Sequence, residues 1–141
     1  MPKMAEGAWR DFLSSRPRTG KLATVRADGA PHVTPVWFDL DGDEVVFTTH
    51  ETSLKGRHIR RDGRVSMCVD DETPPFSYVI VEGTATFSTD QGELLRWATR
   101  LGGRYMGADR AEEYGKRNGV PGELLVRVTP TRVIAEERVA D

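Results

Sequence analysis

Short β-type segments separated by Asp-Gly turns fill the first third of the chain and constrain its fold most strongly. The run KLATVRADGAPHVTPVWFDLDGDEVVFTTH spans residues 21–50 and places Asp28-Gly29 and Asp41-Gly42-Asp43 between apolar segments. Glycine accepts positive φ at little cost, so Asp-Gly between such segments is a strong hairpin signal. The run therefore predicts three antiparallel strands joined by tight turns.

Three later segments continue this pattern, and helical periodicity flanks them. RVSMCVDD, FSYVIVEGTATFS and GELLVRVTPTRVIAEE, at residues 64–71, 76–88 and 122–137, predict three more strands, the last bent or interrupted near Pro130. Apolar residues at helical spacing predict helices at about 6–15 and from Asp90 to a stop at Gly102-Gly103, and a further helix is predicted at about 109–117. Because closure removes exposed edges, we predict a mainly β, α+β fold, a six-stranded antiparallel barrel with flanking helices, in one domain over residues 1–141.

Cysteine content and hydropathy narrow the class of protein. The opening MPKMAEGAWRDFL lacks the apolar core of a signal peptide, and no apolar run approaches the roughly 20 residues of a membrane helix. Cys68 is the only cysteine, which excludes an internal disulfide, and the three histidines show no metal-ligand spacing. We therefore expect a cytoplasmic protein with no metal site and no membrane partner.

Positive charge is concentrated in TSLKGRHIRRD, which spans residues 52–62. This stretch has a net charge of +3 in a chain whose formal net charge is −2, so the remainder sums to −5. A general nucleic-acid binder would usually be basic throughout, and no nucleic-acid partner is expected. The local positive charge instead indicates an anionic ligand or a solvated basic face.

A phosphate site is the specific interpretation of this stretch. Thr52 or Ser53 is suited to cap a helix that Gly63 ends, and Lys55 falls in its first turn. The hydroxyls of Thr48 and Thr49 precede the helix at the end of a predicted strand. Helix N-termini bind phosphates because they combine free N–H groups with a partial positive charge. Surface pairing of these cations with carboxylates is the alternative, and no P-loop or dinucleotide-binding glycine motif decides between them.

The order of these motifs resembles the flavin-binding split β-barrel superfamily, the relatives of pyridoxamine-phosphate oxidase. The resemblance rests on LATVRADGAPHVTPVWF, the next strand, TSLKGRHIRRD and FSYVIVEGTA; it covers about residues 20–85, and more loosely 124–135. The chain is most similar to the actinobacterial branch that uses the deazaflavin coenzyme F420. The resemblance implies an FMN-binding split-barrel fold and a homodimer whose cofactor lies in a cleft between subunits.

The resemblance also implies which residues bind the cofactor. Positions around the phosphate fall on Thr48, Thr49, Ser53, Leu54, Lys55 and Arg61. The strand beside the cofactor ring falls on Pro35, Val36 and Trp37, and the segment contributed across the dimer falls on Phe76, Ser77 and Tyr78. Pro35 agrees with this placement, because a residue that cannot donate a ladder hydrogen bond suits a strand edge that faces a ligand.

The implied function is a coenzyme F420-dependent reductase that transfers a hydride from the reduced deazaflavin to a small organic acceptor. The surplus of basic residues at 52–62 favours a cofactor whose tail extends past its phosphate into glutamates. The alternatives are an FMN-dependent oxidoreductase of the same superfamily and a non-catalytic flavin or F420 carrier. The Arg and His pattern with which pyridoxamine-phosphate oxidases bind their substrate is not visible in TPTRVIAEERVAD, and no catalytic side chain is identified.

Overall fold

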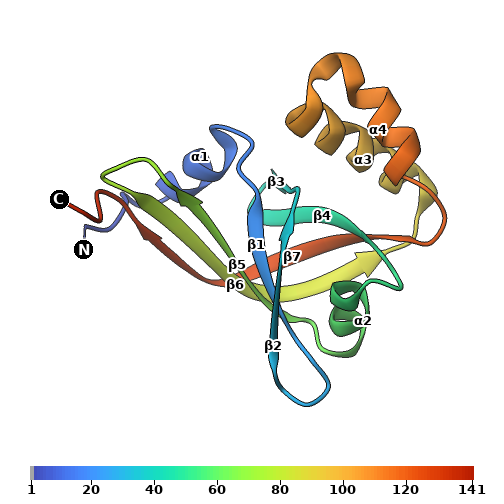
Figure 1. The fold of residues 1–141 in the computed structure, drawn as a ribbon, viewed down its shortest axis with the longest axis horizontal. Helices are drawn as coiled ribbons and strands as arrows, with labels where there is room; N and C mark the ends of the chain where they lie inside the picture. Colours follow the sequence, from blue (N-terminus) through green and yellow to red (C-terminus); the bar gives the residue numbers. More distant parts are fainter. Residues whose placement is uncertain (1) are drawn as a thin grey trace.

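A single seven-stranded antiparallel sheet, strongly curved, organises the molecule (Figure 1). The computed structural model describes residues 2–141. Its elements are α1 (Ala8–Ser14), β1 (Gly20–Val25), β2 (Pro31–Val36), β3 (Asp39–Asp41), β4 (Glu44–His50), α2 (Leu54–Arg61), β5 (Arg64–Asp71), β6 (Ser77–Ser88), α3 (Gln91–Met106), the 3₁₀ turn η1 (Ala108–Arg110), α4 (Ala111–Asn118) and β7 (Glu123–Glu136). The strand order in the sheet is β2-β1-β5-β6-β7-β4-β3. Within residues 2–141, no helix combines the length and hydropathy needed to cross a membrane.

The sheet has seven strands and stays open, so the prediction of a six-stranded closed barrel is wrong on both counts. β2 pairs with β1 and β3 pairs with β4, which places β2 and β3 at opposite edges of the sheet. Trp37 and Phe38 lie between them and break what the sequence predicts as one strand. The Tyr105 hydroxyl accepts a hydrogen bond from the Phe38 N–H at 3.1 Å. The Tyr105 side chain therefore provides a hydrogen-bond partner for the Phe38 backbone, which in a closed barrel would pair with another strand.

The other predicted elements are largely confirmed. The antiparallel mainly β architecture with flanking helices is present, and α1, α2 and α4 form close to where the sequence predicts helices. The irregularity expected near Pro130 is a register shift in which Gly83 faces Pro130 while Glu82 faces Arg132. A bulge therefore bends β7 without interrupting it.

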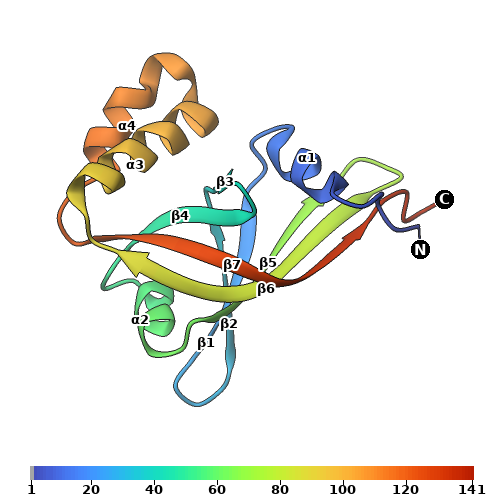
Figure 2. The ribbon, with the colours of Figure 1, turned by 180° about the vertical axis from the view of Figure 1, so that it is seen from behind.

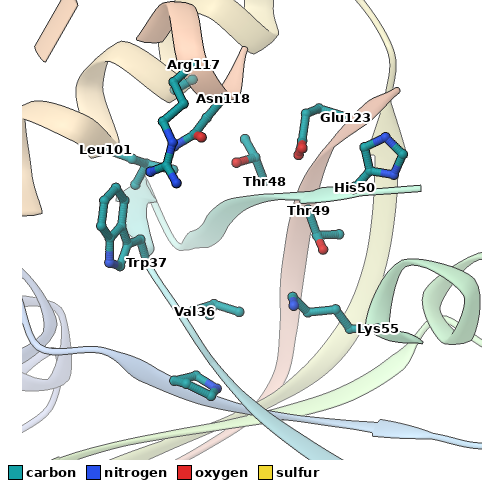
Figure 3. A pocket seen from close by; sticks show the side chains of 12 residues that line it. Val36, Trp37, Thr48, Thr49, His50, Lys55, Leu101, Arg117, Asn118 and Glu123 are labelled. Atoms are coloured by element: carbon teal, nitrogen blue, oxygen red, sulfur yellow. The ribbon is translucent and has the colours of Figure 1, made fainter. Parts of the chain in front are cut away.

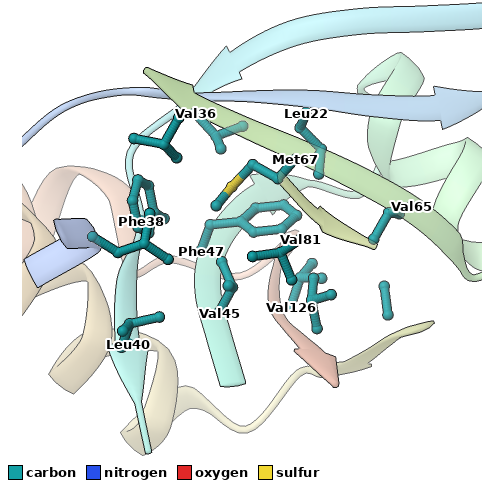
Figure 4. Packing of buried hydrophobic residues seen from close by; sticks show 14 of the residues in the cluster. Leu22, Val36, Phe38, Leu40, Val45, Phe47, Val65, Met67, Val81 and Val126 are labelled. Atoms are coloured by element: carbon teal, nitrogen blue, oxygen red, sulfur yellow. The ribbon is translucent and has the colours of Figure 1, made fainter. Parts of the chain in front are cut away.

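The side chains of the main core point toward one another between the strands of the curved sheet, as Figure 4 shows. Phe47, Met67 and Val81 are among its fully buried side chains, each contributing roughly 1.5–3 kcal/mol through burial. Leu13 of α1 and Ile59 of α2 join the same cluster. The two helices lie far apart along the sheet (Figures 1 and 2), so the core is covered at two separate places.

A second, smaller cluster joins α3 to the opposite side of β4 and β7. It contains Val46, Leu94, Trp97 and Leu125. The sequence predicts that Gly102 and Gly103 end this helix, but α3 continues to Met106. A Cβ atom on Gly102 would lie 2.5 Å from Cβ of Tyr114, so the glycine permits close packing against α4. Tertiary packing therefore overrides the low helix propensity of glycine.

Candidate cofactor site

The junction between β4 and α2 is held by the Ser53 side chain. Its hydroxyl accepts a hydrogen bond from the Gly56 N–H at 3.0 Å, which makes Ser53 the N-cap of α2. The same hydroxyl donates to the His50 carbonyl at 2.7 Å and accepts from the Thr49 hydroxyl at 2.8 Å. Ser53 thus fixes the direction in which α2 leaves the strand, and Lys55 follows in the first turn.

A cleft of about 530 Å³ opens beside this junction (Figure 3). It is bounded by the end of β2, the end of β4, the start of α2 and the pair α3–α4. Its lining residues are Pro35, Val36, Trp37, Thr48, Thr49, His50, Lys55, Ala98, Leu101, Arg117, Asn118 and Glu123. Its volume is in the range typical of small-molecule and cofactor sites.

The edge of β4 that faces the cleft has unpaired backbone. β3 pairs with β4 only from Glu44 to Val46. The Glu51 N–H donates a hydrogen bond to the Gly122 carbonyl at 2.8 Å. In an antiparallel pair the backbone groups of successive residues alternate in direction, so the odd-numbered residues of β4 bond to β7 and the even-numbered residues point their N–H and C=O groups away from it. Thr48 is the first of these beyond the end of β3. Its N–H and C=O are therefore available to a ligand in the cleft.

Lys55 and Glu123 provide opposite charges in the cleft. Both side chains are half-buried, and no ion pair within 4.0 Å is formed by Lys55 among the described residues. Burial lowers the pKa of Lys55, and the charge of Glu123 opposes that shift. Burial raises the pKa of Glu123, against the opposing effects of His50 and Lys55. The Lys55 ammonium lines the cleft without a hydrogen-bond partner in the described chain, so its donors remain for an anion.

Aromatic rings form the wall next to β2. Trp37 stacks on Tyr105 of α3 with ring centroids 5.2 Å apart and planes inclined by 3°. The Trp37 ring also meets the edge of Tyr114 of α4 at 5.8 Å. β2 is an edge strand, and Pro35 lies in it beside the cleft, as its missing N–H suggests. This side of the cleft is apolar and suits a flat ring.

The structure brings together six of the twelve residues that the sequence predicts for cofactor binding. These are Pro35, Val36, Trp37, Thr48, Thr49 and Lys55. Ser53 does not line the cleft and acts through its cap. Leu54 and Arg61 line a different, shallower hollow beside the β1–β2 turn. The Arg61 guanidinium donates a hydrogen bond to the Val25 carbonyl, so it is directed away from Lys55.

Phe76, Ser77 and Tyr78 lie at the start of β6, at the other end of the molecule from the cleft (Figures 1 and 2). Phe76 has φ 68° and remains 42% exposed. Burial raises the pKa of Tyr78, as does the neighbouring charge of Glu136. Within one chain these residues cannot reach the cleft, so their predicted role requires a second subunit.

Sequence reasoning missed Ala98, Leu101, Arg117, Asn118 and Glu123, which complete the cleft. Ala98 and Leu101 belong to the apolar face of α3, where the sequence indicates only packing. Arg117 and Asn118 end a polar helix, and Glu123 begins β7. No local motif marks these positions, because long-range packing alone brings them to the end of β4. His50, considered as a phosphate-loop donor or a structural residue, lines the cleft and shares a hydrogen bond with the Thr52 hydroxyl at 2.8 Å.

The residues of the cleft fit a flavin-type cofactor. The free backbone of Thr48, the nearby hydroxyls and the Lys55 ammonium supply the hydrogen bonds that a phosphate needs. The segment from Pro35 to Trp37 supplies an apolar surface for the ring. Among residues 2–141, no three His, Cys, Asp or Glu side chains gather as a metal site would require.

Comparison with known proteins gives the same result at the level of the family. The sequence profile of the family described as pyridoxamine 5'-phosphate oxidase matches residues 5–136. The chain belongs to this family. Solved structures of similar proteins share the fold seen here, and the family is oxidoreductase-like.

Three similar proteins are informative. A conserved hypothetical protein, Rv2991 from Mycobacterium tuberculosis, has 29% identity and a TM-score of 0.83, covering 96% of this chain and 86% of its own. A structure named F420 reductase has 31% identity and a TM-score of 0.72, covering 92% of this chain and 98% of its own. A 5a,11a-dehydrotetracycline/5a,11a-dehydrooxytetracycline reductase of Streptomyces rimosus is 35% identical over 74 residues, 47% of this chain. The matched region spans 52% of that curated relative, or about half its length.

Proposed function

We propose that the protein is a coenzyme F420-dependent reductase that transfers a hydride from the reduced deazaflavin to a small organic acceptor. One observation carries the proposal: the cleft places the Lys55 ammonium and the open edge at Thr48 beside the apolar segment from Pro35 to Trp37 at the end of β2. A phosphate-bearing cofactor with a planar ring needs both surfaces at once. The similar proteins named F420 reductase and dehydrotetracycline reductase support the reaction class.

In this proposal the deazaflavin supplies the hydride, and the chain supplies position and surroundings. Lys55, with the hydroxyl and the free backbone of Thr48, binds the phosphate. Pro35, Val36 and Trp37 lie along one side of the ring. Ala98 and Leu101 of α3 are almost fully buried, at 2% exposure each, and exclude water from the floor of the cleft.

The proposal includes a homodimer with the cofactor at the subunit interface. Its support is the position of Phe76, Ser77 and Tyr78, which lie far from the cleft of their own chain. The exposed Phe76 ring at the start of β6 is available to a second copy. In the dimer this segment would cover the cofactor bound to the partner's β4 edge.

Titration of the purified protein with coenzyme F420 and with FMN tests the proposal. We expect the fluorescence of coenzyme F420 to change saturably, and the reduced coenzyme to be consumed when a suitable quinone or enone is added. A protein that purifies yellow and binds FMN in preference would support the FMN-dependent alternative. Saturable binding without consumption of reduced coenzyme by any acceptor of the screen would support a carrier.

A further inference from the structure

The cleft contains a second cation that the phosphate does not require. Arg117, near the end of α4, points into the cleft beside Trp37, whereas Lys55 enters from α2 on the other side of β4 (Figure 3). Thr48 lies between the two cations. A cofactor with its phosphate at Lys55 and its ring along β2 therefore leaves Arg117 next to the ring end of the cleft.

Arg117 has no carboxylate within ion-pair distance among the described residues. Other arginines nearby are paired: Arg110 contacts Glu113 at 2.6 Å, and Arg127 contacts Asp41 at 2.7 Å. The Arg117 guanidinium instead lies 5.5 Å from the centre of the Tyr114 ring. Because Tyr114 also touches Trp37, the aromatic wall holds this side chain towards the cleft. All five of its N–H donors remain available to a ligand.

Asn118 follows Arg117 and lines the same part of the cleft. Its amide adds a donor and an acceptor beside the guanidinium. A favourable interaction with the helix C-terminus is the simplest alternative explanation for a cation here. Lys116 lies in the same last turn of α4 but does not line the cleft, so substitutions at the two residues distinguish the explanations.

We propose that Arg117 and Asn118 form the acceptor subsite and select planar acceptors that carry an anionic oxygen, an enolate or a carboxylate. This inference rests on the proposed function. The acceptor lies between the cofactor ring and α4, with its oxygen towards the guanidinium. Arginine suits such a group because its planar guanidinium donates two parallel hydrogen bonds, either to the two oxygens of a carboxylate or to one charged oxygen.

The same placement assists hydride transfer to a conjugated enone. The hydride forms a C–H bond at the carbon distant from the carbonyl, the C=C electron pair shifts to form a double bond to the carbonyl carbon, and the C=O π pair moves onto the oxygen. The acceptor gains two electrons, the coenzyme loses them, and a proton from water completes the product at the carbon next to the carbonyl. Arg117 stabilises the negative charge that develops on the oxygen.

Calorimetric titration with two naphthoquinones of similar shape tests the inference. Lawsone is an enolate at neutral pH, and menadione carries a methyl group in place of the hydroxyl and is neutral. Both are titrated into the protein saturated with oxidised coenzyme F420, which supports binding without turnover. We expect Arg117→Gln to weaken lawsone binding about tenfold while the affinities for menadione and the coenzyme stay unchanged.

Lys116→Gln is the matched control, because it removes one positive charge from the neighbouring exposed position of α4. It should leave all three affinities unchanged, and Arg117→Lys should retain part of the lawsone affinity. The inference is overturned if Arg117→Gln binds lawsone as tightly as the wild-type protein does. It is also overturned if the wild-type protein binds menadione more tightly than lawsone. Weaker coenzyme binding in Arg117→Gln also overturns it, because Arg117 would then belong to the cofactor.

Failure of the proposed function is detected separately by the coenzyme titration of the wild-type protein. If the coenzyme does not bind, lawsone is titrated into the cofactor-free protein and its Arg117→Gln variant. A tenfold difference there retains the anion subsite without the reductase. Equal lawsone affinities of the wild-type protein and the variant would reject both the anion subsite and the reductase.

Discussion

Among single residues, the polar groups at the end of β4 divide into those that hold the backbone and those left free for a ligand. Ser53 uses its hydroxyl to cap α2 and to bind the His50 carbonyl. Lys55 and the backbone of Thr48 have no such structural partner in the described chain. The sequence identifies both kinds of residue by type, but only their hydrogen bonds separate the roles.

Replacing Lys55 by alanine tests the phosphate position. We expect the affinity for coenzyme F420 to fall at least tenfold, because hydrogen bonds to charged groups are worth about 1.5–3 kcal/mol. The fold should persist, since the ammonium makes no ion pair within 4.0 Å in the described chain. Fluorescence titration measures the affinity, and Lys116→Ala is the control. Unchanged affinity in Lys55→Ala would place the phosphate elsewhere.

Glu123 is expected to oppose binding of an anion at Lys55. Burial raises the pKa of Glu123, so its carboxylate neutralises at a higher pH than an ordinary glutamate. Affinity for the phosphate-bearing cofactor should therefore rise as pH falls through that range. Glu123→Gln should bind more tightly at neutral pH and show a flatter pH profile in the same titration.

The same shift affects stability. When a carboxyl group has a higher pKa in the folded than in the unfolded state, the folded protein loses stability as the pH rises through the folded-state pKa. The variant Glu123→Gln avoids this loss and should be more stable than wild type at neutral pH. Glu112→Gln, at an exposed position of α4, serves as the charge control. Weaker cofactor binding by Glu123→Gln would instead mean that the carboxylate accepts a hydrogen bond from a ligand hydroxyl.

Among the elements, the pair α3–α4 shows how packing decides what glycine does. Gly102 lies inside α3, and Gly115 lies inside α4 where a Cβ would meet the Thr99 hydroxyl at 2.0 Å. Both glycines let the helices approach closely. This approach positions Arg117 and Asn118 beside the cleft, so the packing of two helices builds a wall of the site.

Alanine at two glycines of α3 should have opposite effects. Gly102→Ala places a methyl group 2.5 Å from Cβ of Tyr114, and overpacking of this kind typically costs about 1–3 kcal/mol. At Gly92 the nearest atom is Asp90 Oδ1 at 3.4 Å, so the higher helix propensity of alanine should stabilise by up to roughly 1 kcal/mol. Urea denaturation of both variants measures the difference. Equal stabilisation of the two would contradict the close packing of α3 on α4.

At the scale of the whole molecule, the curved sheet separates two groups of predicted cofactor residues. The β4–α2 junction lies at one end and the start of β6 at the other (Figures 1 and 2). One chain therefore presents half of the expected environment at each end. A two-fold dimer that brings the end of one chain to the cleft of its partner would unite them.

Light scattering should give a mass twice the 15.7 kDa of one chain. Phe76→Ala should weaken cofactor binding although Phe76 lies far from its own cleft. A mixed dimer of Phe76→Ala and Lys55→Ala chains would hold one intact site, so co-expression should recover tight binding in part of the protein. A monomer, or a mixture that binds no better than either variant, would rule out a shared site.

The sequence by itself determined the elements whose signals are local. Asp-Gly turns, strand periodicity and a hydroxyl cap at Thr52 or Ser53 specify the hairpins and α2, because each depends on residues only a few positions apart; the structure assigns the cap to Ser53. The motif order also indicated the family, which the match over residues 5–136 confirms.

Only the tertiary structure decided how these elements meet. The break at Trp37 and Phe38 depends on Tyr105, which lies 67 positions beyond Phe38 in the chain. Comparable distances in sequence separate Lys55 from Glu123 and Arg117, which share its cleft. Local patterns carry no information about such pairs, because contacts between distant segments follow from the packing of the sheet and helices as a whole.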